Sequence, residues 1–132
     1  AKLLKGASLT IHEKLMTHGS QYAETDFTVD MDGEDSSANV VSRSVAKEES
    51  HQIFRSRING NNRCSGHTEC DAIIMDDASV SAIPELTAND IDAALIHEAA
   101  IGKIAGEQLI KLMTLGLTEA EAEEQIVNGF LK

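Results

Sequence analysis

The feature that most constrains this chain is a period of two in its polarity, which runs from Ala7 to about Ile83. Around Phe27, Val29 and Met31, for example, each intervening residue is polar. Such alternation is expected when a strand has one buried face and one solvated face. The stretches SLTIHEKL, ANVVSRSV and HQIFRSRI show the same character and are separated by Gly, Asn, Ser and Asp. The sequence therefore predicts a succession of short β-strands.

The breaks between these strands indicate repetition without a clear repeat motif. They fall after Met31 (DGEDSS), after Ala46 (KEES) and after Ile58 (NGNN), so the repeats differ in length. A meander, a sandwich or the coils of a β-solenoid would all satisfy this periodicity. With only three Phe, one Tyr and no Trp, the core must consist of small and aliphatic side chains, which favours stacked coils over a sandwich.

After Ile101 the period changes to that of helices. Leu109, Leu112 and Met113 fall at i, i+3 and i+4 of a first helix. Gly116 is expected to end this helix, because glycine readily adopts the left-handed cap conformation. Thr118 then begins a second helix as the first residue of a capping box. We expect an antiparallel helix pair that closes the β part or offers a docking face, and we divide the chain into residues 1–100 and 101–132.

The second helix has its own apolar stripe, and its capping box is completed by an acidic residue three positions after the cap. That residue is Glu121, and the stripe consists of Ala122, Ile126 and Phe130. Such a capping box stabilises a helix by about 1 kcal/mol.

Composition excludes several classes of partner and location. A net charge of −11 over 132 residues repels nucleic acid and anionic membrane surfaces. No apolar run approaches the roughly 20 residues that span a bilayer. Two cysteines are too few for a secreted disulfide scaffold, so we expect reduced thiols and a cytoplasmic protein. The chain begins with Ala1, which suggests that it starts inside a longer protein.

The segment with the most metal-ligating residues is Cys64-Ser-Gly-His67-Thr-Glu-Cys70-Asp71. Cys64, His67 and Cys70 are spaced three residues apart, and thiolate with imidazole suits zinc or an iron–sulfur cluster. The spacing matches no standard zinc-finger or ferredoxin pattern. The alternative is that both cysteines are small hydrophobic core residues and the histidine is satisfied by the backbone.

A second candidate is the pair His97-Glu98, at the end of the strand-like sequence DAALIHEAA. Adjacent residues of a strand point to opposite faces, so these two cannot share a pocket unless the strand ends there. A histidine and a carboxylate could form an acid–base pair. However, no nucleophile motif, phosphate-binding loop or H-E-x-x-H sequence accompanies them, and we expect no enzymatic activity.

Several motifs in the second half of the chain resemble the ends of SufB and SufD proteins, which build iron–sulfur clusters in the SUF system. They are Cys70-Asp-Ala-Ile-Ile-Met75, His97-Glu-Ala-Ala-Ile-Gly-Lys-Ile104, Glu107-Gln-Leu109, Gly116-Leu-Thr-Glu-Ala-Glu-Ala122 and Ile126-Val-Asn-Gly-Phe130. The resemblance implies a right-handed parallel β-helix (β-solenoid) followed by a small carboxy-terminal helical subdomain. It also implies a non-enzymatic scaffold, since family members assemble a nascent cluster between two such solenoids.

The resemblance assigns roles to individual residues. Cys70 matches the SufB cysteine linked to cluster building, Glu98 matches a SufB carboxylate implicated as a ligand, and His97 matches a histidine shared by SufB and SufD. These three are the expected ligands of a transient iron–sulfur cluster. Glu98 makes the site more similar to SufB, because SufD usually has glycine there. Cys64 has no counterpart in the family.

The expected partners also follow from the resemblance. They are a SufC-type ABC ATPase docked by the terminal helices, a SufB or SufD paralogue or a second copy of the chain, and a cysteine desulfurase system as sulfur source. Two alternatives remain open. The chain could be a structural subunit that dimerises and recruits the ATPase without a cluster of its own, or a zinc-binding β-domain that uses Cys64, His67 and Cys70.

Overall fold

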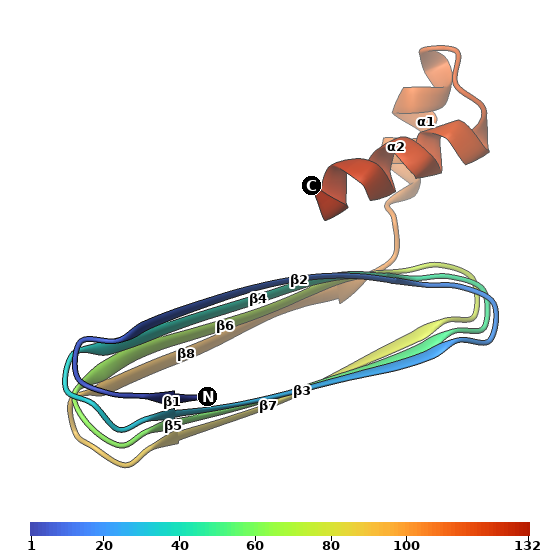
Figure 1. Cartoon of the computed structure of the whole chain (residues 1–132). Coiled ribbons are helices and arrows are strands. Elements are labelled where there is room, and N and C mark those ends of the chain that lie inside the picture. The colour runs from blue at the N-terminus through green and yellow to red at the C-terminus, as the bar shows by residue number, and fades with distance from the viewer.

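The computed structural model describes residues 1–132 as two stacked parallel sheets followed by two helices (Figure 1). One sheet has the strand order β1-β3-β5-β7 and the other β2-β4-β6-β8, and every pair of neighbouring strands is parallel. The strands are β1 (Lys2–Leu3), β2 (Ser8–Thr17), β3 (Tyr22–Met31), β4 (Ser36–Ala46), β5 (His51–Gly60), β6 (Cys64–Ile74), β7 (Ser79–Ala88) and β8 (Ala93–Gly102); the helices are α1 (Gly106–Thr114) and α2 (Glu119–Leu131).

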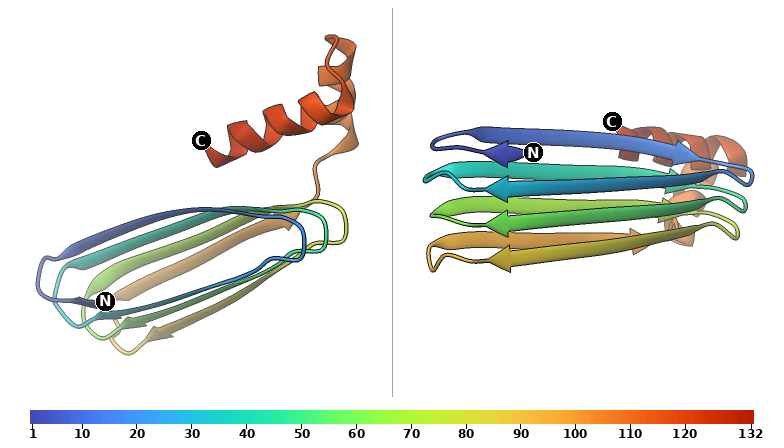
Figure 2. Two further views of the ribbon diagram at one scale, coloured as in Figure 1. Left: turned by 45° about the vertical axis from the view of Figure 1, so that its right-hand side comes forward. Right: turned by 60° about the horizontal axis from the view of Figure 1, so that its bottom comes forward.

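Because consecutive strands lie in opposite sheets, the chain winds as a flattened coil. Each strand pairs with the strand one coil further on: Ser36 is in register with Cys64, and Cys64 with Ala93. Residues in register on neighbouring coils are accordingly 28 or 29 positions apart in sequence. A meander or a sandwich would need antiparallel neighbours, so the prediction of a parallel β-solenoid is confirmed, with about three turns (Figure 2).

Alternate residues of each strand fill the narrow space between the sheets. One core cluster contains Val29, Met31 and Ile58, and a second contains Val40, Phe54 and Cys70. The intervening residues form the outer faces, which are largely polar. On the β3, β5 and β7 face, for instance, Arg57 pairs with both Asp26 and Glu85. The alternation found in the sequence is thus the inside–outside alternation of the coils.

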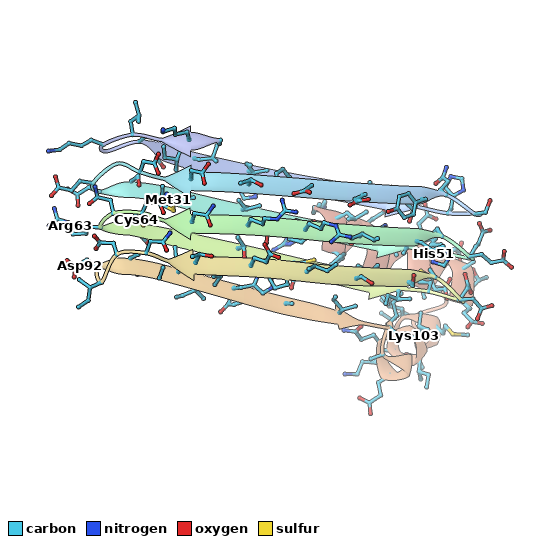
Figure 3. The ribbon with its side chains drawn as sticks, turned by 90° about the horizontal axis from the view of Figure 1, so that it is seen from below. Met31, His51, Arg63, Cys64, Asp92 and Lys103 are labelled. Atoms are coloured by element: carbon cyan, nitrogen blue, oxygen red, sulfur yellow. The ribbon has the colours of Figure 1, made fainter.

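Short turns join the two sheets, and equivalent turns repeat the same backbone conformation. Gly19, Glu48 and Asp76 occupy the second position of three successive turns and all have φ between 56° and 59°. The Gly19 N–H donates to the Glu48 carboxylate, and the Glu48 N–H donates to Asp76 Oδ2 at 3.1 Å. Each turn therefore satisfies a backbone donor of its neighbour, which keeps the coils in register. Figure 3 looks onto one sheet, with His51 at this end of the coils and Arg63 and Asp92 at the other.

Helix α1 ends and helix α2 begins where the sequence predicts. Thr118 caps α2 by accepting from the Glu121 N–H, while the Glu121 carboxylate accepts from the Thr118 N–H at 2.8 Å. Gly116 has φ +96°, as expected for the residue that ends α1. Neither helix is long and apolar enough to cross a membrane.

Helix α2 lies over the outer face of the sheet that contains β4 (Figures 1 and 2). Val45 of β4 is fully buried although strand alternation turns it outward, and Val127 of α2 is also buried. The contact between α2 and β4 attaches the helical segment to the solenoid. Helix α1, in contrast, has no buried residue.

Candidate functional site

The candidate residues lie on β6 and β8, where the second sheet ends. No further strand pairs with β8, and β7 is likewise the last strand of the other sheet. After Gly102 the chain leaves the sheet for the helices, so these two edges stay free. The side chains beside them are exposed although several are apolar: Leu86 is 38% exposed and Ile96 56%. His97 and Glu98 therefore sit on an edge strand.

His97 points into the solenoid. Its Nδ1 lies 2.5 Å from Oγ1 of Thr68, the residue in register with it on β6. Its Nε2 is buried and has no hydrogen-bond partner. Burial, followed by the nearby His67, lowers the pKa of the His97 imidazole, so the neutral form is favoured. A neutral imidazole with one free nitrogen is a potential ligand.

Cys70 also points inward, but it is enclosed. It is 1% exposed and packs in the core cluster with Val40 and Phe54. Ala99 of β8 is in register with it, so the edge strand separates the thiol from the open end of the solenoid. Burial, and then the charges of Asp71 and Glu13, raise the pKa of the Cys70 thiol to about 11. In this conformation Cys70 is a protonated core thiol and a poor nucleophile or ligand.

Glu98 points the opposite way, onto the outer face of the sheet. There it is in register with Glu69, and its Oε2 lies 3.3 Å from Nε2 of His67. The structure thus places the three sequence-predicted residues on two faces: Cys70 and His97 inside, Glu98 outside. The strand does not end at His97, because β8 continues to Gly102.

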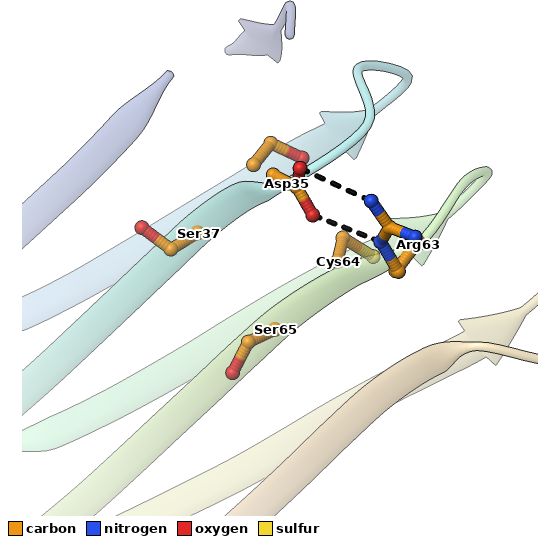
Figure 4. A pocket seen from close by; sticks show the side chains of 6 residues that line it. Asp35, Ser37, Arg63, Cys64 and Ser65 are labelled. Carbon is orange, nitrogen blue, oxygen red and sulfur yellow. Dashed lines mark hydrogen bonds and ion pairs between the residues drawn. The ribbon is translucent and has the colours of Figure 1, made fainter. Parts of the chain in front are cut away.

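The combination of Cys64, His67 and Cys70 does not form a zinc site. Both thiols point inward while His67 points outward. The two cysteines are also six positions apart along β6, which corresponds to about 20 Å. Burial raises the pKa of the Cys64 thiol as well. Next to Cys64, the Arg63 guanidinium donates two hydrogen bonds, of 2.9 and 3.2 Å, to the Asp35 carboxylate. Both residues lie at the rim of a hollow lined by small polar side chains (Figure 4).

Sequence reasoning overlooked Glu69. His67, Glu69 and Glu98 each place one ligand atom within 4.8 Å of the others, which is a spacing that could hold a metal ion. A hydrogen bond with Asp71, followed by partial burial and the charge of Asp71, raises the pKa of Glu69. The period of two already put His67 and Glu69 on one face. Their proximity to Glu98 depends on the length of the coil, which the sequence did not reveal.

Comparison with known proteins places these features in a family. Residues 3–130 match the family model "SUF system FeS cluster assembly, SufBD core domain". An iron-sulfur cluster assembly SufBD family protein of Methanothermobacter thermautotrophicus is 42% identical over 103 residues, which are 76% of this chain and 25% of that protein. Similar proteins of Archaeoglobus fulgidus (41% over 102 residues, 76% and 27%) and Methanocaldococcus jannaschii (38% over 104 residues, 78% and 33%) carry the same family name.

The chain spans only about a quarter to a third of the length of these curated relatives. Within that span, however, the family model covers almost every residue, including both sheets, the edge strand β8 and the two helices. The chain therefore belongs to the SufBD core-domain family.

Proposed function

We propose that this chain is part of a non-enzymatic scaffold on which an iron–sulfur cluster is assembled between two subunits. The observation that carries the proposal is the match of residues 3–130 to the SufBD core domain. In this proposal the nascent cluster is cargo, and Cys70, His97 and Glu98 are its ligands. Sulfur would come from a cysteine desulfurase system, and the cluster would be assembled in the cytoplasm.

The free edges of β7 and β8 support the choice of a SufBD-type chain as the partner. Unpaired backbone groups on two adjacent edge strands invite pairing with another sheet, and exposed Leu86 and Ile96 add apolar surface to it. Because the partner's own edges would be similar, the simplest assembly is an isologous dimer. We expect the isolated chain to be a homodimer at micromolar concentration by light scattering, and a monomer mass would contradict this.

Helix α1 supports docking of a SufC-type ATPase. None of its residues is buried, and it presents Ile110 and Met113, which are 62% and 43% exposed, beside exposed Leu115. An apolar helix face of this kind is suited to a groove on another protein. In the proposed assembly this helix joins the ATPase to the solenoid through the buried Val45–Val127 region.

The burial of Cys70 favours a second candidate function, a structural subunit that dimerises and recruits the ATPase without a cluster of its own. Ligation by Cys70 requires a thiolate, and the folded chain holds the thiol protonated behind β8. In the scaffold proposal the edge strand must open before this cysteine can bind iron. In the structural proposal it never opens.

Anaerobic reconstitution with iron and sulfide tests the two. Cys70→Ser and Glu98→Ala should each reduce the visible absorption of the cluster, while Cys64→Ser should leave it unchanged, because Cys64 lies about 20 Å away along β6. Circular dichroism checks that all variants fold. If both serine variants lose the absorption, or neither does, Cys70 is not the ligand. If the parent chain itself develops no absorption, the structural role replaces the scaffold role.

A further inference from the structure

The outer face of β6 and β8 carries a group of potential ligands that are unlike the other charged residues of the surface. On the opposite sheet, carboxylates are neutralised by arginine: Glu24 pairs with Arg55, and Arg57 lies between two acidic side chains. Glu98, in contrast, has only His67 within ion-pair distance, and Glu69 forms no ion pair. Two carboxylates thus lie side by side with no lysine or arginine within ion-pair distance, although Arg43 lines the same hollow as Glu69.

The hydrogen bonding of His67 determines which of its nitrogens is free. Its Nδ1 lies 2.9 Å from Oδ1 of Asn39 on β4, an oxygen that can only accept. With the Asn39 amide in this orientation, Nδ1 carries the hydrogen, and in the neutral ring Nε2 presents its lone pair. Donation from the second ring nitrogen to an oxygen is the arrangement that orients ligand histidines in metal sites. In this chain the Asn39 side-chain oxygen accepts that hydrogen bond from His67 Nδ1.

The lone pair of His67 Nε2 faces an oxygen that also needs a donor. Glu98 Oε2 lies 3.3 Å from it. A protonated imidazole would make an ion pair with this oxygen, whereas with the neutral ring two acceptors face each other and a bound cation would satisfy both. Two ligand atoms bound tetrahedrally at about 2.1 Å from one ion are separated by about 3.4 Å. The separation of 3.3 Å therefore fits two ligands of one metal ion as well as it fits an ion pair. Glu69 completes the group within 4.8 Å.

From this geometry we propose that His67, Glu69 and Glu98 form a binding site for a divalent first-row metal ion on the outer face of the solenoid. One imidazole and two carboxylates suit Fe²⁺, Zn²⁺ or Co²⁺ better than Ca²⁺ or Mg²⁺, which prefer oxygen ligands alone. The three residues come from two adjacent strands of a rigid sheet, and the remaining positions on the ion are open to solvent. Such a site binds an ion and releases it readily.

The identification of the physiological ion as Fe²⁺ rests on the proposed function. In that setting the outer-face site holds iron near the partner surface, because Glu98 lies on edge strand β8. It is separated from Cys70 by the thickness of the sheet, since the thiol points to the interior. Metal binding at the outer face therefore does not require the thiol. Glu98 is common to both sites, so His67 and Glu69 test the outer-face site and Cys70 tests the cluster site.

Co²⁺ is the probe for the test, because its visible absorption reports both occupancy and ligand type. The reduced 132-residue chain is titrated with CoCl₂ by absorption and calorimetry. We expect one equivalent to bind, His67→Ala and Glu69→Gln each to weaken binding at least tenfold, and no thiolate-to-cobalt charge-transfer band to appear. Matched controls are His51→Ala on the opposite sheet and Glu49→Gln in a turn, and both should bind within about twofold of the parent chain.

Cys70→Ser separates this inference from the proposed function. If the outer-face site is correct, this variant binds Co²⁺ like the parent, whether or not cluster reconstitution succeeds. Three results would overturn the site. The first is no binding of Co²⁺ to the parent chain at millimolar concentration, and the second is unchanged binding in both His67→Ala and Glu69→Gln. The third is a thiolate-to-cobalt charge-transfer band in the parent chain that is lost, together with Co²⁺ binding, in Cys70→Ser. Failure of reconstitution with intact Co²⁺ binding would overturn only the scaffold role.

Discussion

Burial of the Cys70 thiol makes a quantitative prediction about stability at alkaline pH. The thiol has a pKa of about 11 in the folded chain, against its ordinary value of 9.0. The folded state therefore binds more protons than the unfolded state between these values, and stability falls as pH rises through this range. With about 1.4 kcal/mol for each pKa unit, the whole difference is worth up to about 2.7 kcal/mol below pH 9. From pH 8 to pH 10 about 1.3 kcal/mol of it should be lost.

The assay compares the parent chain with Cys70→Ala, which has no titrating group at this position. Urea unfolding followed by circular dichroism at about pH 8 and about pH 10 gives the free energy of unfolding of each. Other alkaline titrations affect both chains equally, so only the Cys70 contribution remains in the difference. The parent should lose about 1.3 kcal/mol more than the variant between the two pH values. Cys70→Ser, which packs differently but also does not titrate there, should show the same pH dependence as Cys70→Ala.

A difference between parent and variant that stays constant with pH would refute the reasoning. It would mean that the thiol ionises equally easily in both states, and hence that Cys70 is reached by solvent. Rapid alkylation of Cys70 in the folded chain at about pH 8 would lead to the same conclusion. Either result would remove the need for β8 to open before this cysteine can bind iron.

Two further changes test the packing of the coils and of the helices. In Gly33→Ala the new Cβ would lie 1.9 Å from the backbone carbonyl carbon of Leu4. Thermal unfolding should therefore show a loss of about 3 kcal/mol or more in the free energy of unfolding. The control is Gly129→Ala, which has open space around the new Cβ and should not be destabilised. Val127→Ala removes two buried methyl groups at the contact of α2 with the sheet. It should lower the free energy of unfolding in urea by about 1–2 kcal/mol and speed proteolysis between β8 and α1. Unchanged proteolysis would mean that α2 is not held there.

Local sequence patterns were sufficient to predict most of the individual elements. Breaks after Met31 and Ala46 coincide with the ends of β3 and β4, while β5 continues two residues beyond the expected end at Ile58. The helix boundaries depended on Gly116 and the Thr118 capping box, whose effects are confined to a single turn of chain. Such interactions are readable because both partners lie within a few residues of each other.

The arrangement of coils was not readable in this way, because parallel pairing joins residues 28 or 29 positions apart. Equivalent turn positions are filled by Gly19, Glu48 and Asp76, which share a backbone conformation but no side-chain chemistry. The repeat is therefore conformational rather than compositional. The scarcity of aromatic residues favoured stacked coils, but the parallel solenoid was predicted from the family resemblance. For the same reason the sequence placed His97 and Glu98 on opposite faces correctly but did not bring Glu69 beside Glu98.

Edge strand β8 connects the two halves of the candidate site. It carries Glu98 on its outer face, His97 on its inner face and, with Ala99, covers Cys70. β8 forms backbone pairs with β6 alone, whereas β6 is held on both sides by β4 and β8. Of the two strands, β8 is therefore the one whose displacement breaks fewer hydrogen bonds. A partner sheet that pairs with its free edge would replace backbone bonds lost during such a displacement. Docking of the partner and exposure of the thiol would then both depend on β8. Displacement of β8 would also move Glu98 away from His67 and Glu69 on β6 and so disrupt the outer-face group.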